Sequence, residues 1–245
     1  GSCSNTINNC YSLKNYKGMY LNNSSYNLLK DNTVCSSVSY GINLQNYSSY
    51  NLLLSNTALY NSRSFYFEVN SDTNILTGNT AKYSNGQGFN FENVKGYTVT
   101  GNTAISNIGP GFYVNGSLYN TLTGNTSTLN TTFGFDVRDG SANILNGNIS
   151  YNNLQYGVYL KTEVNSKFSN NKSDSNVQYG LYMEQNANNN IFTGNTINSN
   201  LQHGIYVASS SNNKFEQNDI KNNIQYQIYL TGTSLADTFT KNNIQ

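Results

Sequence analysis

The chain has 245 residues, a formal net charge of +1 and charged side chains at only 10% of its positions. This balance offers neither the basic stripe of a nucleic-acid-binding protein nor an acidic surface for a basic partner, and no apolar run approaches the roughly 18 residues of a membrane span. Asparagine fills about one position in five, which argues against an ordinary α/β enzyme because Asn is disfavoured inside helices and strands.

The first segment, residues 1–17, is the least regular part of the chain. It opens on Gly-Ser, which resembles an expression scar at residues 1–2. The three cysteines, Cys3, Cys10 and Cys35, lie in or near this segment, and their spacing is not that of a metal site. We expect at most one disulfide, between Cys3 and Cys10. Residues 1–17 are predicted to form a partial N-terminal coil or cap.

From residue 18 onward, a segment with apolar residues two positions apart recurs every 23 or 24 residues. Such segments begin at residues 18, 41, 64, 88, 111, 134, 157, 180, 204 and 227, with Gly as the first residue in all but two. A period of two indicates a strand with one buried face. Two further short strands follow in each repeat, one with a large inward residue such as Leu76 and one with a small residue such as Ala81. The pattern predicts that residues 18–245 form one all-β domain, a right-handed parallel β-helix of about ten coils with three strands per coil.

Asparagine recurs at the turns of these repeats. One column comprises Asn9, Asn32, Asn56, Asn79, Asn102, Asn125, Asn148, Asn171, Asn195, Asn218 and Asn242. A weaker column follows five residues later and comprises Asn61, Asn107, Asn130, Asn153, Asn176, Asn200 and Asn223. Asn tolerates left-handed backbone, and its amide can bond to copies in the coils above and below. We therefore predict that these residues are structural.

The repeat unit combines a Gly-Asn turn with a following segment such as Gly-Ile-Tyr-Val at residues 204–207. It resembles the parallel β-helix repeat of pectate-lyase-like proteins, and especially that of NosD-like surface proteins. The resemblance covers about residues 5–245 and implies an extracellular or cell-surface location with a polysaccharide or cell-surface glycan as partner. The group includes lyases, hydrolases, epimerases and adhesins, so the fold does not choose an activity. One His and two Met cannot assemble a copper site.

Outward positions on the first strand of each coil form the predicted binding surface. One column is rich in tyrosine, and the next carries a charge in five of ten coils. The predicted ligand-binding residues are Tyr66, Glu68, Glu92, Tyr113, Asp136, Arg138, Tyr159, Lys161, Tyr182 and Glu184. Aromatic rings can stack on sugar faces, and carboxylates can accept hydrogen bonds from hydroxyl groups. The same side chains also fit an ordinary solvated strand face, because tyrosine favours strands and exposed charges contribute little.

Two functions fit this surface. The first is an extracellular, carbohydrate-binding or structural and adhesive module, which is favoured because no long loop forms the wall of a groove. The alternative is a polysaccharide lyase or glycoside hydrolase. In a lyase, Lys161 would be the base and Arg138 would assist it. In a hydrolase, Glu92 and Asp136, with Glu68, would supply paired carboxylates.

No cofactor is expected apart from a Ca²⁺ ion at Glu68 and Glu92, which repel each other unless a cation or a hydroxyl lies between them. His203 falls in a column with Tyr179 and Tyr226, where it is expected to replace a stacking ring. Solenoid ends need capping, and no amphipathic cap is visible here. We therefore expect further domains or chains to stack at the ends, and we expect no nucleic-acid partner.

Overall fold

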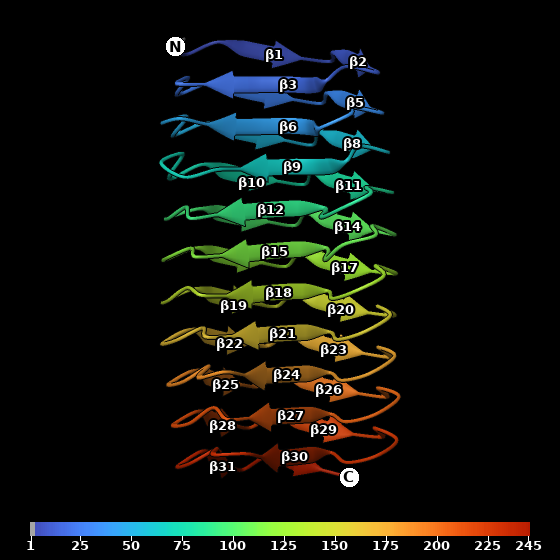
Figure 1. Ribbon diagram of the computed structural model, residues 1–245, viewed down its shortest axis with the longest axis vertical. Coiled ribbons are helices and arrows are strands. Elements are labelled where there is room, and N and C mark those ends of the chain that lie inside the picture. Colours follow the sequence, from blue (N-terminus) through green and yellow to red (C-terminus); the bar gives the residue numbers. More distant parts are fainter. Residues whose placement is uncertain (1–2) are drawn as a thin grey trace.

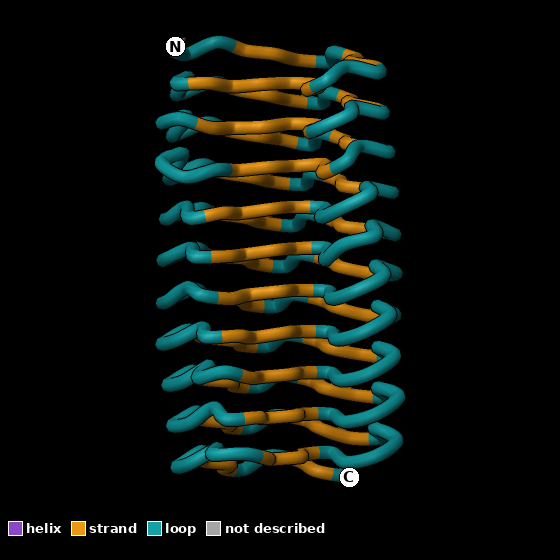
Figure 2. Tube along the Cα trace, viewed as in Figure 1, coloured by secondary structure: helices purple, strands orange, loops and turns teal. Residues whose placement is uncertain are grey.

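The computed structural model describes residues 3–245 and shows an all-β rod of stacked parallel coils (Figure 1). The residues predicted to be an expression scar, 1–2, lie outside the described residues. Figure 2 shows strands and turns and no helix in the described part of the chain. Each full coil contributes one strand to each of three parallel sheets. The predicted parallel β-helix with three strands per coil is therefore confirmed.

Sheet one is built from three-residue strands whose central residue points into the rod. The central residues include Leu53, Leu76 and Phe215, all fully buried, whereas their neighbours on each strand are partly or fully exposed. In order, its strands are β1 (Thr6–Asn8), β4 (Leu28–Lys30), β7 (Leu52–Leu54), β10 (Ile75–Thr77), β13 (Thr98–Thr100), β16 (Thr121–Thr123), β19 (Ile144–Asn146), β22 (Lys167–Ser169), β25 (Ile191–Thr193), β28 (Lys214–Glu216) and β31 (Thr238–Thr240).

Sheet two follows sheet one after a short turn in every coil. Its inward residues are small or β-branched, such as Ala81, Ser150 and Ile220. Its strands are β2 (Tyr11–Leu13), β5 (Thr33–Cys35), β8 (Thr57–Leu59), β11 (Thr80–Lys82), β14 (Thr103–Ile105), β17 (Thr126–Thr128), β20 (Ile149–Tyr151), β23 (Lys172–Asp174), β26 (Thr196–Asn198), β29 (Asp219–Lys221) and β32 (Asn243–Ile244).

The third sheet, called here the long-strand sheet, has strands of four to six residues. Two side chains of each strand point into the core, and those between and after them point outward. Its strands are β3 (Lys17–Asn22), β6 (Tyr40–Gln45), β9 (Arg63–Phe67), β12 (Phe89–Glu92), β15 (Phe112–Asn115), β18 (Phe135–Arg138), β21 (Val158–Lys161), β24 (Leu181–Glu184), β27 (Ile205–Ala208) and β30 (Ile228–Thr231).

The asparagine columns form hydrogen-bonded ladders along the rod. Asn125 is typical, because its backbone N–H and its side-chain Nδ2 both donate to Oδ1 of Asn148 at 2.9 Å. Its Nδ2 also donates to the carbonyl oxygen of Val99 at 2.9 Å. Each amide thus ties three coils together, and both predicted columns are confirmed as structural from Asn32 onward.

A third ladder was not predicted. It lies five residues before the main column and comprises Asn27, Asn51, Asn74, Asn120, Asn143, Asn190 and Asn213. Tyr97 replaces Asn in one coil, where its hydroxyl accepts from Asn74 Nδ2 at 2.7 Å and donates to the Ser71 carbonyl at 2.5 Å. The signal for this ladder was the recurring five-residue spacing between Asn residues.

The first coil differs from the expected register. Asn8 pairs with Lys30 and Tyr11 pairs with Thr33, so Cys10 and not Asn9 lies opposite Asn32. The prediction that Asn9 belongs to the main ladder is therefore wrong, because this coil is one or two residues shorter than the others. The Cys10 backbone N–H donates to Asn32 Oδ1 at 2.9 Å. All three cysteines are free, so the structure lacks the expected Cys3–Cys10 bridge.

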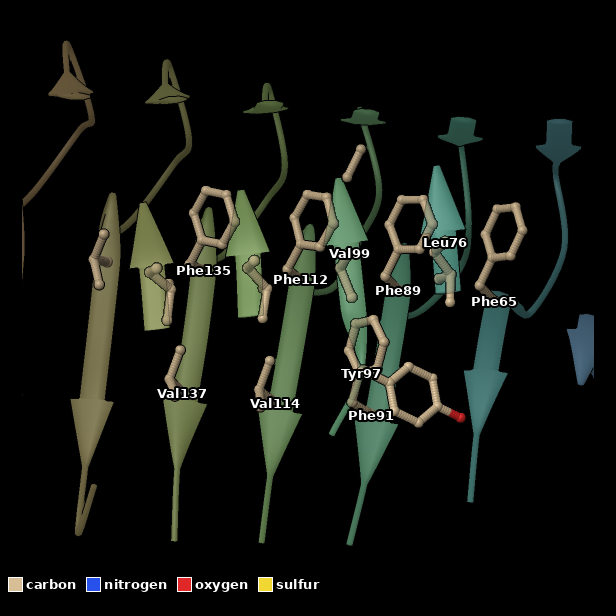
Figure 3. Close-up of a cluster of buried hydrophobic side chains, with 14 of the residues drawn as sticks. Phe65, Leu76, Phe89, Phe91, Tyr97, Val99, Phe112, Val114, Phe135 and Val137 are labelled. Atoms are coloured by element: carbon tan, nitrogen blue, oxygen red, sulfur yellow. The ribbon is translucent and has the colours of Figure 1, made fainter. Parts of the chain in front are cut away.

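Stacked phenylalanines fill much of the core. Phe65, Phe89, Phe112 and Phe135 stack in one row, with ring centroids 4.6, 4.7 and 4.9 Å apart (Figure 3). In the later coils the row moves to sheet one, where Phe168, Phe192, Phe215 and Phe239 stack at 4.9, 4.7 and 4.5 Å. Each of these coils therefore places one of its phenylalanine rings in one or the other of these rows.

Candidate binding face

The candidate site is the outer face of the long-strand sheet, where outward side chains are held in exact register. The column alternates tyrosine with a short polar residue over seven coils. Its members are Tyr20, Asn43, Tyr66, Asn90, Tyr113, Asp136 and Tyr159, each paired with the next. From Tyr159 onward the column is tyrosine in every coil, through Tyr182, Tyr206 and Tyr229.

This outward column is buried in part and not exposed along its whole length. Asn43, Asn90 and Asp136 have no exposed surface, and Tyr66 and Tyr159 are only 7% exposed. The cause is lateral packing, because neighbouring side chains one strand spacing away cover the shorter ones. The face therefore presents the half-buried tyrosines, such as Tyr113 and Tyr182, and the ends of charged side chains, with the short polar groups beneath them.

Asp136 and Arg138 form a closed ion pair in the middle of the face. Arg138 Nε donates to Asp136 Oδ1 at 2.8 Å, and Nη2 donates to the second carboxylate oxygen. The guanidinium lies between the rings of Tyr113 and Tyr159, 5.2 Å from each centroid. Burial raises the pKa of Asp136 to about 6, although Arg138 opposes this shift. These two catalytic candidates therefore neutralise each other.

A second cluster surrounds Glu92. The Tyr66 hydroxyl donates to Glu92 Oε2 at 2.5 Å, and Asn90 Nδ2 lies 3.4 Å from Oε1. Burial and then Glu92 raise the pKa of Tyr66. Glu68 directly follows β9, and Glu92 occupies the corresponding position in the next coil because Phe67 pairs with Phe91. The Oδ1 atom of Asn90 is buried without a hydrogen-bond partner.

A third cluster is centred on Glu184. Tyr182 donates to Glu184 Oε2 at 2.7 Å, and Tyr159 donates to the other carboxylate oxygen. Lys161 lies in register between Arg138 and Glu184. It forms no ion pair with any residue in the range 3–245. The structure thus brings the predicted residues to one face, where Tyr159 joins the Asp136 and Glu184 clusters and Glu92 forms a cluster of its own with Tyr66.

His203 has the predicted role of a stacking ring. Its ring lies 5.1 Å from Tyr179 and 5.3 Å from Tyr226, in a row that also contains Phe133 and Tyr156. The backbone N–H of Tyr226 donates to its Nδ1 at 3.3 Å, and burial lowers the pKa of the imidazole. This row packs against the outward tyrosines, so the later coils carry a double row of rings.

One buried carboxylate was missed by the sequence analysis. Glu163 has no exposed surface and accepts from the Gly140 N–H at 3.0 Å and Asn143 Nδ2 at 2.8 Å. Ser166 interrupts the third Asn ladder here, and its hydroxyl also donates to Glu163. Burial raises the pKa of Glu163. The carboxylate thus replaces a missing ladder amide and lies away from the candidate face.

Neither a cluster of metal-binding side chains nor a membrane-spanning helix occurs in the described part of the chain. Residues 3–245 contain no group of three or more His, Cys, Asp or Glu side chains arranged to hold a metal. A Ca²⁺ ion at Glu68 and Glu92 remains a prediction. No helix long and apolar enough to cross a membrane occurs in the same range.

Comparison with known proteins supports the architecture. The family described as right handed beta helix region matches residues 1–104 and 87–244, which together span nearly the whole chain. The chain belongs to this family. Among curated proteins, none matches it by sequence.

Solved structures of other right-handed β-helix proteins show the same fold. The A-module of mannuronan C-5 epimerase AlgE4 from Azotobacter vinelandii has a TM-score of 0.68 and 13% identity, covering 100% of this chain and 87% of that one. The periplasmic alginate epimerase AlgG has a TM-score of 0.58 and 14% identity, covering 91% and 77%. The Dettilon tailspike protein gp208 has a TM-score of 0.68 and 16% identity, covering 94% and 60%. At these identities the likeness concerns the fold alone.

Proposed function

We propose that the outer face of the long-strand sheet binds an extended polysaccharide that lies along the rod axis. The observation that carries this proposal is the strip of outward tyrosines, such as Tyr113 and Tyr182, and charged side chains from β9 to β24, in a chain with only 10% charged residues. Tyrosine presents an apolar ring and a polar hydroxyl, which suits a ligand with apolar ring faces and hydroxyl edges. Every coil from β9 to β24 contributes a tyrosine or a charged side chain to the strip, which suits a polymeric ligand.

One observation supports a binding module over an enzyme. Three of the candidate catalytic residues are already engaged, since Asp136 pairs with Arg138 and Glu92 accepts from Tyr66. Two of the similar structures are named as epimerases of mannuronan and alginate, which supports a polysaccharide ligand but does not separate binding from catalysis. We therefore propose an extracellular or cell-surface module with a carbohydrate-binding or adhesive role.

A glycan array followed by titration calorimetry tests the proposal. We expect Tyr113→Ala to weaken binding of the selected glycan at least tenfold, because the ring lies in the middle of the strip. Tyr151→Ala is the matched control, since Tyr151 is 37% exposed and points outward from sheet two. Absence of binding to any glycan, or an equal loss in the control, would overturn the proposal. Release of unsaturated or reducing ends from the bound glycan would replace it with the enzyme alternative.

A further inference from the structure

The chain contains three Asn-Gly dipeptides, a pairing that is chemically reactive. They occupy residues 85–86, 115–116 and 146–147. In such a pair, the side-chain carbonyl carbon of Asn and the backbone nitrogen of Gly can close a five-membered ring. Glycine favours this reaction because it has no Cβ to hinder the approach. All three pairs consist of the same two residues, so their surroundings in the fold decide which one reacts.

Two of these pairs lie at the ends of strands and are held by bonds between coils. Asn115 is the last residue of β15, and the Gly116 N–H donates to a carbonyl of the next coil at 3.0 Å. Asn146 is the last residue of β19, and the Gly147 N–H donates to the next coil at 2.9 Å. Both asparagines are half-buried. The glycine nitrogen of each pair is therefore fixed in place and reaches the side chain only when the coil opens locally.

The pair at residues 85–86 lies in the corner between β11 and β12 and is held less tightly. Asn85 is exposed, and its side chain forms no hydrogen bond within residues 3–245. The N–H of Gly86 has no acceptor in the same range. The equivalent N–H groups of Arg63 and Gly109 donate to the preceding coil at 3.2 and 2.9 Å. The Gly86 nitrogen thus lacks the bond that holds its counterparts in the neighbouring coils.

The second asparagine ladder is interrupted at the same corner. Ser84 occupies the ladder position between Asn61 and Asn107, and its N–H donates to Asn107 Oδ1 at 3.0 Å. Its hydroxyl pairs with the Ser64 hydroxyl at 2.6 Å, so it does not extend the ladder to Asn61. The corner therefore makes fewer hydrogen bonds to the preceding coil than the corner at residues 107–109 does. Segments with few such bonds open at a lower cost in free energy.

We infer that Asn85 is a modification site, at which the folded chain deamidates spontaneously to aspartate and isoaspartate. The Gly86 nitrogen loses its proton and attacks Cγ of Asn85. An N–Cγ bond forms, the Cγ–Nδ2 bond breaks and ammonia leaves. Water then adds to one of the two carbonyl carbons of the cyclic imide and opens the ring, which gives aspartate or isoaspartate. Nothing is oxidised or reduced, and water is the only co-reactant.

The reaction changes both the charge and the backbone of this corner. Each converted chain gains one carboxylate, which takes the formal net charge from +1 to 0. Isoaspartate also lengthens the backbone by one methylene group just before β12. The Gly109 N–H donates to the Gly86 carbonyl at 2.9 Å, so the longer backbone disturbs a bond between two coils. Asn85 is not one of the residues proposed to bind a glycan, so this modification is independent of that function.

Peptide mapping by mass spectrometry tests the inference on the full folded chain, aged in water that contains heavy oxygen. Ring opening places one heavy oxygen atom in each converted residue. We expect Asn85 to convert at least tenfold faster than Asn115 or Asn146, and faster still as the pH rises, because the attacking nitrogen must lose a proton. Asn85→Gln should abolish the early acidic form in isoelectric focusing, since glutamine would have to close a six-membered ring. Asn115→Gln is the matched control and should leave that form unchanged.

The chain unfolded in urea separates the effect of the fold from that of the local sequence. There the bonds between coils are lost, and we expect the three Asn-Gly pairs to convert at similar rates. Equal rates in the folded chain would overturn the inference, because the bonds of Gly116 and Gly147 would then give no protection. A preference for Asn85 that persists unchanged in urea would also overturn it, since the flanking sequence and not the free Gly86 N–H would be the cause.

Discussion

At the scale of single residues, the ladder amides combine two tasks that separate residues usually perform. Asn125 Oδ1 accepts from both the backbone N–H and the Nδ2 of Asn102, at 2.9 and 3.0 Å. Its own donors reach the next coil and the preceding one. An apolar side chain at this position would leave buried donors without partners.

We expect Asn125→Ala to lower the free energy of unfolding by about 1–3 kcal/mol, because it leaves buried N–H groups of Asn102 without an acceptor. Asn85→Ala is the control, since Asn85 is exposed and no side-chain hydrogen bond of it is found in the described residues. That substitution should cost less than about 0.5 kcal/mol. Urea denaturation of both variants measures the difference, and equal changes would contradict the ladder's energetic role.

The buried Asp136 gives the stability a dependence on pH. Its folded pKa is raised from 3.8 to about 6, so the folded protein binds this proton more tightly than the unfolded chain. The resulting stabilisation is complete below the unfolded pKa and is lost as pH rises through about 6. We expect a loss on the order of 1–3 kcal/mol between about pH 4 and pH 7.

Denaturation across that pH range tests this with Asp136→Asn. The variant should be less stable overall, because Arg138 loses its charged partner in a half-buried site. Its stability should nevertheless change less steeply with pH than that of the unsubstituted protein. An identical slope in both proteins would show that another group, such as Glu163, carries the pH dependence.

At the scale of the elements, the two phenylalanine rows meet at an imperfect junction. The row of the long-strand sheet ends at Phe135, and Val158 takes the next place in register. The row of sheet one begins at Phe168. A small apolar cavity lies at this junction and is lined by Val158, Phe168 and Leu181 among others. The change of row therefore leaves the core less tightly packed in one coil.

Val158→Ile should raise the free energy of unfolding by about 0.5–1 kcal/mol, because the added methylene fills existing space. Val137→Ile is the matched comparison one coil earlier, where Val137 is fully buried and does not line the cavity. Overpacking there should destabilise by about 1 kcal/mol or more. Thermal and urea unfolding of the two variants measure these changes. Changes of the same sign in the free energy of unfolding of both would contradict the presence of unfilled space at Val158.

Most of the fold follows from the sequence because a solenoid repeats one local rule. Each coil must bury the same inward positions and bond the same turn amide to its neighbours, so a period of 23 or 24 residues is visible directly. The slip at Cys10 was not predictable, because a single short coil has no second copy to reveal it. The Asn ladder containing Asn74 and Asn143 was predictable from the five-residue spacing between Asn residues.

The candidate face was predictable only in part. The outward direction of Asn90 and Asp136 follows from the strand period of two, whereas their burial does not. Their burial depends on how the tyrosines of neighbouring coils pack over them. It also depends on the ion pair between Arg138 and Asp136. Such lateral contacts involve side-chain rotamers, which repeat spacing leaves open.

At the scale of the whole molecule, the rod is a one-dimensional stack in which each coil contacts mainly its two neighbours. The three ladders and three sheets therefore hold every coil at the same spacing, and the tyrosines along the face inherit that spacing. A rigid face with a fixed repeat suits a ligand with its own fixed repeat. Stacking of further domains or chains at the ends remains a prediction.

The affinity for the selected glycan should therefore grow with its length. The strip from β9 to β24 spans five coil steps, or about 24 Å at one strand spacing per step. Each two coils add at least one further tyrosine, so a longer oligosaccharide gains contacts without losing additional overall rotational freedom. Calorimetry with oligomers of two, four, six and eight sugars tests this. We expect the affinity to rise with length and then level off once the oligomer covers the strip. Truncating the far ring with Tyr182→Ala should weaken only the longer oligomers, and equal weakening of the disaccharide would contradict an axial path for the polymer.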